Sequence, residues 1–176
     1  SATRRVCEVT HPIYVEMGDT TTIILPDPKY RISCTISFGE HVLYTQFCSL
    51  PITKQSFAKE LSKARTFCPD YYEIESLMLA GLIRGASLDN AMVFKDGAII
   101  CKDGLRYPNE CVRHKTLDIV GDLSLVGCRL QGHVVAVRPG HPSNVALAKK
   151  IREEMISTPL DSLSYFQTNA PPKNMT

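Results

Sequence analysis

Alternation of apolar and polar positions dominates the first fifty residues and predicts β-strands. Four such segments follow one another, at residues 13–17, 21–25, 30–38 and 42–48. Turn-forming residues separate them, among them Gly18-Asp19 and Gly39. We expect a three-stranded meander within this region.

A helix is expected after Thr53, a predicted N-cap, because apolar residues recur there at helical spacing. Further helices are expected at residues 72–80, 110–126 and 144–155, with a hairpin at 91–94 and 98–102 around Asp96-Gly97 and a strand at 134–137. This order predicts an α+β fold, a two-layer sandwich whose mainly antiparallel sheet is covered on one face by helices. A helix and hairpin at about 71–102 form an insert. Residues 1–157 are predicted to form one domain, and the Ser-, Asn- and Pro-rich residues 158–176 a flexible tail.

The segment 110–126 carries two stripes at helical spacing. An apolar stripe is expected to face the core, at Val112, Thr116, Ile119, Leu123 and Val126. His114, Asp118 and Asp122 form a second, polar stripe at successive i+4 positions.

The composition narrows the classes of function. With 44% hydrophobic residues in 176, the chain can bury a substantial core. Its 20 basic and 18 acidic residues leave a formal charge of +2, without the basic stripe of a nucleic-acid-binding protein. We find no apolar run of membrane-spanning length and no signal-peptide pattern, so a cytoplasmic protein is expected.

The cysteines do not form a recognisable framework. Seven is an odd number, and no C-x-x-C pair occurs. Any metal ion is therefore expected to bind His and carboxylate side chains.

His114 and Asp118 are the candidate metal ligands, because their spacing places an imidazole and a carboxylate one helical turn apart. Such a pair supplies two of the three protein ligands of a hydrolytic zinc site. The alternative is an ordinary solvated helix face.

Three other positions have a chemical and a structural interpretation. His141, at a strand-to-helix turn, could be an acid or base whose charged form a nearby carboxylate such as Asp122 favours, or could simply bond to the backbone. Thr66 could donate to an oxyanion or merely end a helix, and Lys115 could anchor substrate or be solvated. Glu40-His41 is interpreted as a surface turn, and His11 and His133 as structural residues.

Four blocks together resemble one family. They are 64–67 (ARTF), 81–91 (GLIRGASLDNA), 105–107 (LRY) through 112–118 (VRHKTLD) with 121–123 (GDL), and 140–141 (GH). Their order and spacing resemble the C-terminal domain of the zinc-dependent UDP-3-O-acyl-N-acetylglucosamine deacetylases of lipid A synthesis. The resemblance extends from about Tyr14 to Ile151.

The resemblance implies hydrolysis of the N-acetyl group of a UDP-linked, 3-O-acylated glucosamine, with Zn²⁺ as cofactor. It implies that His114 and Asp118 bind zinc, that His141 acts as a general acid and that Asp122 tunes it.

It further implies that Thr66 stabilises the oxyanion and that Lys115 contacts substrate. The part of the insert from about Tyr71 to Phe94 would form the apolar passage for the acyl chain, with Phe67 near its mouth.

The family's first zinc ligand and its general base are an adjacent His and Glu in an N-terminal domain that nothing here matches. The chain is therefore expected to be the second half of such an enzyme, with weak zinc affinity and little activity alone. Two alternatives remain: a non-catalytic module that binds a lipid, nucleotide-sugar or protein partner, and a small-molecule domain that binds phosphate through Lys115 and Arg113.

Overall fold

The computed structural model describes residues 6–37, 45–68, 71–81, 85, 87–96 and 98–157. Within these ranges the strands are β1 (Val6–Glu8), β2 (Ile13–Met17), β3 (Thr20–Leu25), β4 (Tyr30–Ser37), β5 (Thr45–Pro51), β6 (Thr66–Cys68), β7 (Ala91–Lys95), β8 (Ala98–Ile100) and β9 (Arg129–Val137). The helices are α1 (Lys54–Ser56), which continues as a π-helical turn (Phe57–Leu61), α2 (Tyr71–Leu79), α3 (Glu110–Leu123), which ends in a 3-10 turn (Ser124–Val126), and α4 (His141–Ser157).

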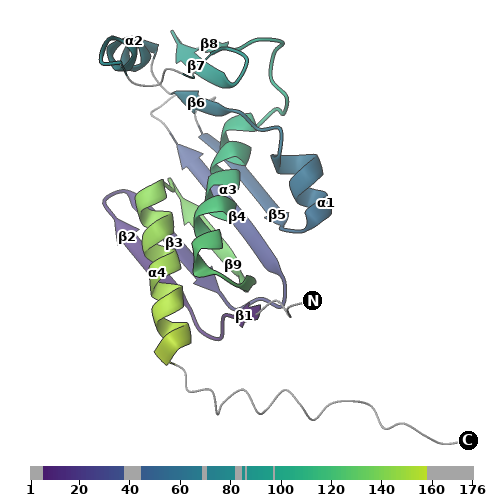
Figure 1. The fold of residues 1–176 in the computed structure, drawn as a ribbon. Helices are drawn as coiled ribbons and strands as arrows, with labels where there is room; N and C mark the ends of the chain where they lie inside the picture. The colour runs from purple at the N-terminus through teal and green to yellow at the C-terminus, as the bar shows by residue number, and fades with distance from the viewer. Residues whose placement is uncertain are drawn as a thin grey trace, which may run out of the picture.

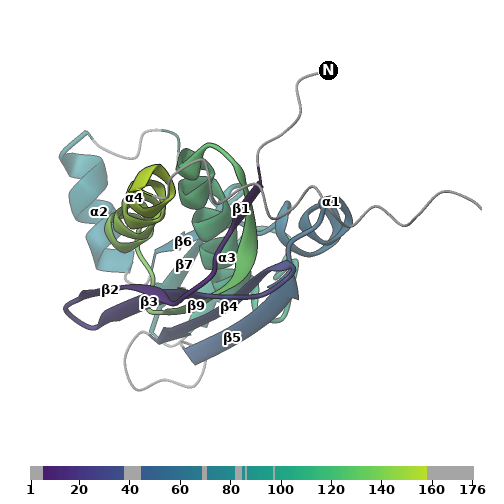
Figure 2. The ribbon, with the colours of Figure 1, turned by 90° about the horizontal axis from the view of Figure 1, so that it is seen from below.

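The main sheet has the strand order β2-β3-β9-β4-β5, and β1 pairs with the start of β9. The pairs β2–β3, β3–β9 and β4–β5 are antiparallel, whereas β4–β9 and β1–β9 are parallel. Helices α3 and α4 lie side by side on one face of this sheet (Figure 1), and the view from below shows the two layers (Figure 2). The predicted α+β sandwich with helices on one face is confirmed.

The predicted meander is wrong, because β9 lies between β3 and β4. This strand extends from Arg129, five residues before its expected start, and its alternating burial matches a central position. At Gly132 a β-carbon would lie 3.0 Å from the Ile24 side chain, so glycine permits the close approach of β3. Alternation along the N-terminal segments identifies strands and their buried faces, but it does not identify which strand lies between them.

Helix α3 has the predicted apolar stripe. All five of its members are buried, namely Val112, Thr116, Ile119, Leu123 and Val126. Helix α4 contributes buried Leu147, Ala148 and Ile151 to the same core. In the described residues, no helix combines the length and apolar composition needed to cross a bilayer.

A second sheet, with the order β6-β7-β8, lies at the N-terminal end of α3 (Figure 1). The predicted β7–β8 hairpin is confirmed, with Lys95 opposite Ala98. Strand β6 was not expected, and Thr66 begins it instead of ending a helix. The reason is tertiary, since Thr66 pairs in parallel with Ala91, 25 positions further along the chain.

Several predictions fall outside the described residues. These are the turn at Gly39 with Glu40-His41, the beginning of the strand expected at 42–48, the turn residue Gly97, parts of the insert and the tail 158–176. The division of the chain at residue 157 therefore stays a prediction.

Candidate functional site

The N-terminus of α3 is fixed by hydrogen bonds with strand β5. The amide of Val112, one of the first-turn N–H groups that lack a helical partner, donates to the side-chain oxygen of Gln46 at 3.1 Å. Asn109, the N-cap residue, donates to the carbonyl of Phe47 at 3.0 Å. Strand β5 therefore anchors the helix that carries the candidate ligands.

His114 and Asp118 lie together, as their spacing predicts. Their nearest atoms, Nε2 and Oδ1, are 3.5 Å apart, and the side chains are only 18% and 14% exposed. Two donors about 2.1 Å from a common tetrahedral zinc ion lie about 3.4 Å from each other. The pair therefore has the separation of two ligands of one metal ion.

The surroundings of His114 show which of its nitrogens faces that gap. Its Nδ1 lies 3.2 Å from the carbonyl oxygen of Ala64, which can only accept, so Nδ1 carries the proton. Nε2 then faces a carboxylate oxygen that is also an acceptor, at the separation of two ligands of one metal ion. These two residues therefore fit the metal that the resemblance implies.

Phe67 and Lys115 surround the same two residues. The ammonium of Lys115 lies 3.2 Å from Oδ2 of Asp118 and 5.9 Å from the centroid of the Phe67 ring. The Phe67 ring in turn meets the ring of His114 edge-on, with centroids 6.5 Å apart. Thr66, which precedes Phe67, is exposed and lies two residues after the carbonyl that His114 contacts.

His141 joins the polar stripe of α3 through Asp122. As the first residue of α4, it places Nδ1 2.9 Å from Oδ2 of Asp122. The buried side chain of Asn144 donates to the same oxygen at 2.9 Å. Asp122 is near the end of α3, where the helix dipole disfavours an anion, but it lies against the first turn of α4, where the dipole favours one.

The first turn of α4 is itself fixed by a reciprocal pair of contacts. The amide of Gly140 donates to the hydroxyl of Ser143 at 3.2 Å, and that hydroxyl donates to the carbonyl of Gly140 at 2.9 Å. The backbone of His141 is therefore held, whereas its side chain is 66% exposed.

Of the seven predicted site residues, His114, Lys115, Asp118 and Phe67 form one cluster, and Thr66 adjoins it. Asp122 and His141 form a second pair, one helical turn beyond Asp118 on the same stripe, about 6 Å along the axis. Across the part of the chain that the structure describes, no three His, Cys, Asp or Glu residues are placed to hold a metal ion. His114 and Asp118 by themselves would supply two ligands of such a site.

The other two histidines that the structure describes have separate partners. Nε2 of His11 lies 2.6 Å from Oε2 of Glu154, and Nε2 of His133 lies 2.8 Å from the hydroxyl of Ser33. Both agree with the structural interpretation.

Arg113, the candidate phosphate ligand, is engaged by its neighbours. Its guanidinium donates to Glu60 at 2.8 Å and to Asn109 at 2.7 Å, and it stacks 4.8 Å from the centroid of the Tyr107 ring. With only 16% of its side chain exposed, it is poorly placed to bind an external phosphate.

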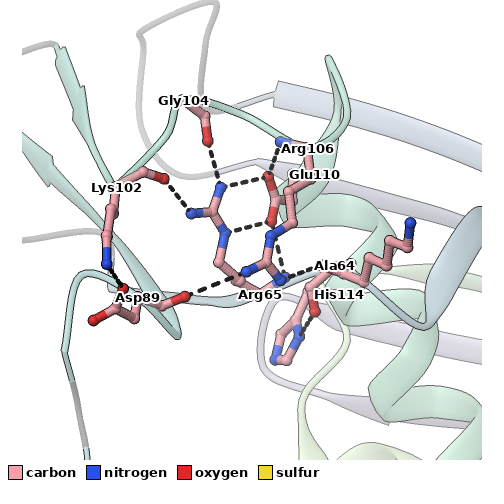
Figure 3. Close-up of polar contacts among 9 residues, drawn as sticks. Ala64, Arg65, Asp89, Lys102, Gly104, Arg106, Glu110 and His114 are labelled. Atoms are coloured by element: carbon pink, nitrogen blue, oxygen red, sulfur yellow. Dashed lines mark hydrogen bonds and ion pairs between the residues drawn. The ribbon is translucent and has the colours of Figure 1, made fainter.

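Sequence reasoning missed a buried ion pair between Arg65 and Glu110 beside the site (Figure 3). Their side chains are 3% and 0% exposed, and Nε of Arg65 lies 2.8 Å from Oε1 of Glu110. Burial raises the pKa of the Glu110 carboxyl, but hydrogen bonds from Arg65 and from the Arg106 amide outweigh burial and hold that pKa below its ordinary value. The two residues are 45 positions apart, so no local pattern could have paired them.

Known proteins resemble this chain over most of its length. A family model described as UDP-3-O-acyl N-acetylglycosamine deacetylase matches residues 1–153. A UDP-3-O-acyl-N-acetylglucosamine deacetylase of Chlamydia felis is 46% identical over 151 residues, which cover 85% of this chain and 54% of that protein. The protein of the same name from Chlamydia trachomatis serovar L2 is 42% identical over 154 residues, covering 87% of this chain and 54% of that protein. The chain spans about half the length of these curated relatives.

Proposed function

The chain belongs to the UDP-3-O-acyl N-acetylglycosamine deacetylase family, and from that premise we propose that it supplies the second half of a zinc-dependent active site. The reaction is removal of the N-acetyl group from UDP-3-O-acyl-N-acetylglucosamine in lipid A biosynthesis. A further domain would supply the first half of that site, with a third zinc ligand and the general base. The proposal includes a cytoplasmic location for the protein.

The gap between His114 and Asp118 is the observation that carries the proposal. A half-buried imidazole and carboxylate are 3.5 Å apart, with both facing atoms acting as acceptors. When bound there, zinc would polarise the amide carbonyl and activate a water molecule.

The remaining residues act around the scissile amide. The exposed hydroxyl of Thr66 donates to the developing oxyanion. His141 gives a proton to the leaving amine, and Asp122 holds its Nδ1 so that Nε2 faces outward. Phe67 contacts the acyl chain near the mouth of its passage, and Lys115 contacts substrate while holding Asp118 at 3.2 Å.

Zinc titration of the chain tests the proposal. The chain is expected to take up one Zn²⁺ weakly, measured by competition with a chromophoric chelator, because it contributes two ligands. His114→Ala and Asp118→Ala should each reduce the affinity by about 100-fold or more. Glu60→Gln, which removes a carboxylate paired with the adjacent Arg113, should leave it unchanged.

Uptake that neither ligand substitution alters would contradict the proposal. The chain would then fit the alternative of a non-catalytic binding module. Turnover of the UDP-acyl-sugar by this polypeptide alone would contradict the assignment of the third ligand and the general base to a further domain.

A further inference from the structure

The peptide group between Ala64 and Arg65 is bound by α3 at both of its polar atoms. Its carbonyl oxygen accepts from Nδ1 of His114 at 3.2 Å. Its N–H, on Arg65, donates to Oε1 of Glu110 at 3.0 Å. Glu110 and His114 are four residues apart and lie one turn apart on α3 (Figure 3).

The Glu110 carboxylate is fully engaged. Oε1 accepts from the amide and from Nε of Arg65, and Oε2 accepts from the guanidinium of Arg65 at 3.0 Å and from the amide of Arg106 at 2.7 Å. Four hydrogen bonds fill the acceptor sites of a carboxylate, so its orientation is fixed.

Arg65 is bound on its other side by the chain that returns from the second sheet. Its guanidinium donates to the carbonyls of Lys102 and Gly104 at 2.9 and 2.7 Å. The pair therefore joins three segments: the start of β6, the return from β8 and the first turn of α3.

Stability alone does not account for this pair. A buried ion pair can often be replaced by packed apolar residues with no loss of stability, because charges are costly to remove from water. Apolar residues, however, would leave the Arg65 amide without its acceptor.

We propose that Glu110 is a positioning residue for His114, acting through the Ala64–Arg65 peptide, and that Arg65 holds the carboxylate in place. A carboxylate that accepts the N–H of a peptide polarises it and makes its carbonyl a stronger acceptor. That carbonyl keeps the proton on Nδ1 of His114 and directs Nε2 toward Asp118. The inference deepens the proposed function, since it rests on His114 as a metal ligand.

The first test uses the unsubstituted chain and ¹⁵N NMR of its imidazoles. His114 should carry a proton on Nδ1, and the Arg65 amide should exchange slowly with solvent. A His114 ring protonated on Nε2 alone would overturn the proposal whatever the variants show.

The second test compares three variants by the same NMR signal and by competition for Zn²⁺. In Glu110→Gln, the proton should be shared between Nδ1 and Nε2, and Zn²⁺ affinity should fall about 10-fold. Arg65→Met/Glu110→Gln removes both charges, so it should fold even if the single variant does not, and it should show the same losses. Glu60→Gln, which breaks the neighbouring ion pair of α3, should match the unsubstituted chain.

An unchanged Nδ1 proton and unchanged Zn²⁺ affinity in the double variant would overturn the proposal. If the unsubstituted chain binds no Zn²⁺ at His114, the proposed function fails, and the position of the imidazole proton alone still decides the role of Glu110.

Discussion

The two ends of α3 hold their charged groups in opposite ways. At the N-terminal end, Arg65 and Glu110 are 3% and 0% exposed and have hydrogen bonds on all sides. At the C-terminal end, Asp122 is 17% exposed and its partner His141 is 66% exposed. The first pair is enclosed by the protein, whereas the second opens to solvent.

This difference matches the two proposed roles. A group that orients a metal ligand must not move, and burial with complete hydrogen bonding fixes it. A group that exchanges a proton with substrate must be reachable from outside, and solvent keeps its interactions weak. The two pairs should therefore respond very differently to substitution and to pH.

Arg65→Met should give the largest effect on stability. It leaves the Glu110 carboxylate buried without its counter-charge, which costs about 3–5 kcal/mol in the free energy of unfolding. Urea denaturation followed by circular dichroism measures the loss. The matched control is Arg138→Met, whose pair with Asp19 is 46% and 87% exposed and should change stability by less than about 1 kcal/mol. Equal losses in both variants would remove the distinction between enclosed and exposed pairs.

Acid should lower the free energy of unfolding through Glu110, at the N-terminal end of α3, by a smaller amount than Arg65→Met does. The pKa of Glu110 is lower in the folded protein than its ordinary value of 4.5, so the unfolded chain binds its proton first as pH falls. The stabilisation is therefore complete above about pH 4.5 and is lost as pH drops through the lower, folded pKa.

Urea titrations between pH 3 and pH 7 measure this dependence. The free energy of unfolding should decline more steeply below pH 4.5 in the unsubstituted chain than in Arg65→Met/Glu110→Gln. Parallel curves would show that Glu110 does not contribute to the acid sensitivity.

Asp122→Asn should give the smallest effect on stability, about 0–1 kcal/mol, because the His141 side chain that it uncouples is 66% exposed and asparagine keeps an oxygen that can accept from Asn144. The visible change should be in His141, whose Nδ1 loses its charged partner. Side-chain NMR relaxation of His141 should then show faster motion, with the α4 backbone unchanged. A loss above about 2 kcal/mol would mean that this end of α3 is as enclosed as the other.

The sequence predicted α3 well, because helix geometry links residues three and four apart. Its five buried residues and the meeting of His114 with Asp118 follow from that spacing alone. The placement of Phe67 and Thr66 beside this pair was suggested by the family resemblance and lay beyond any local rule. Strand β9 between β3 and β4, and β6 beside β7, came only from the structure.

By itself, the sequence determined the α+β class, the hairpins β2–β3 and β7–β8, and the two faces of α3. These depend on periodicity and turn chemistry, which act over a few residues. Only the tertiary structure decided which strands are neighbours, which oxygen of Asp122 meets His141 and which residues enclose Glu110. The physical reason is that burial and hydrogen bonding between residues 19 to 116 positions apart depend on the packed chain as a whole.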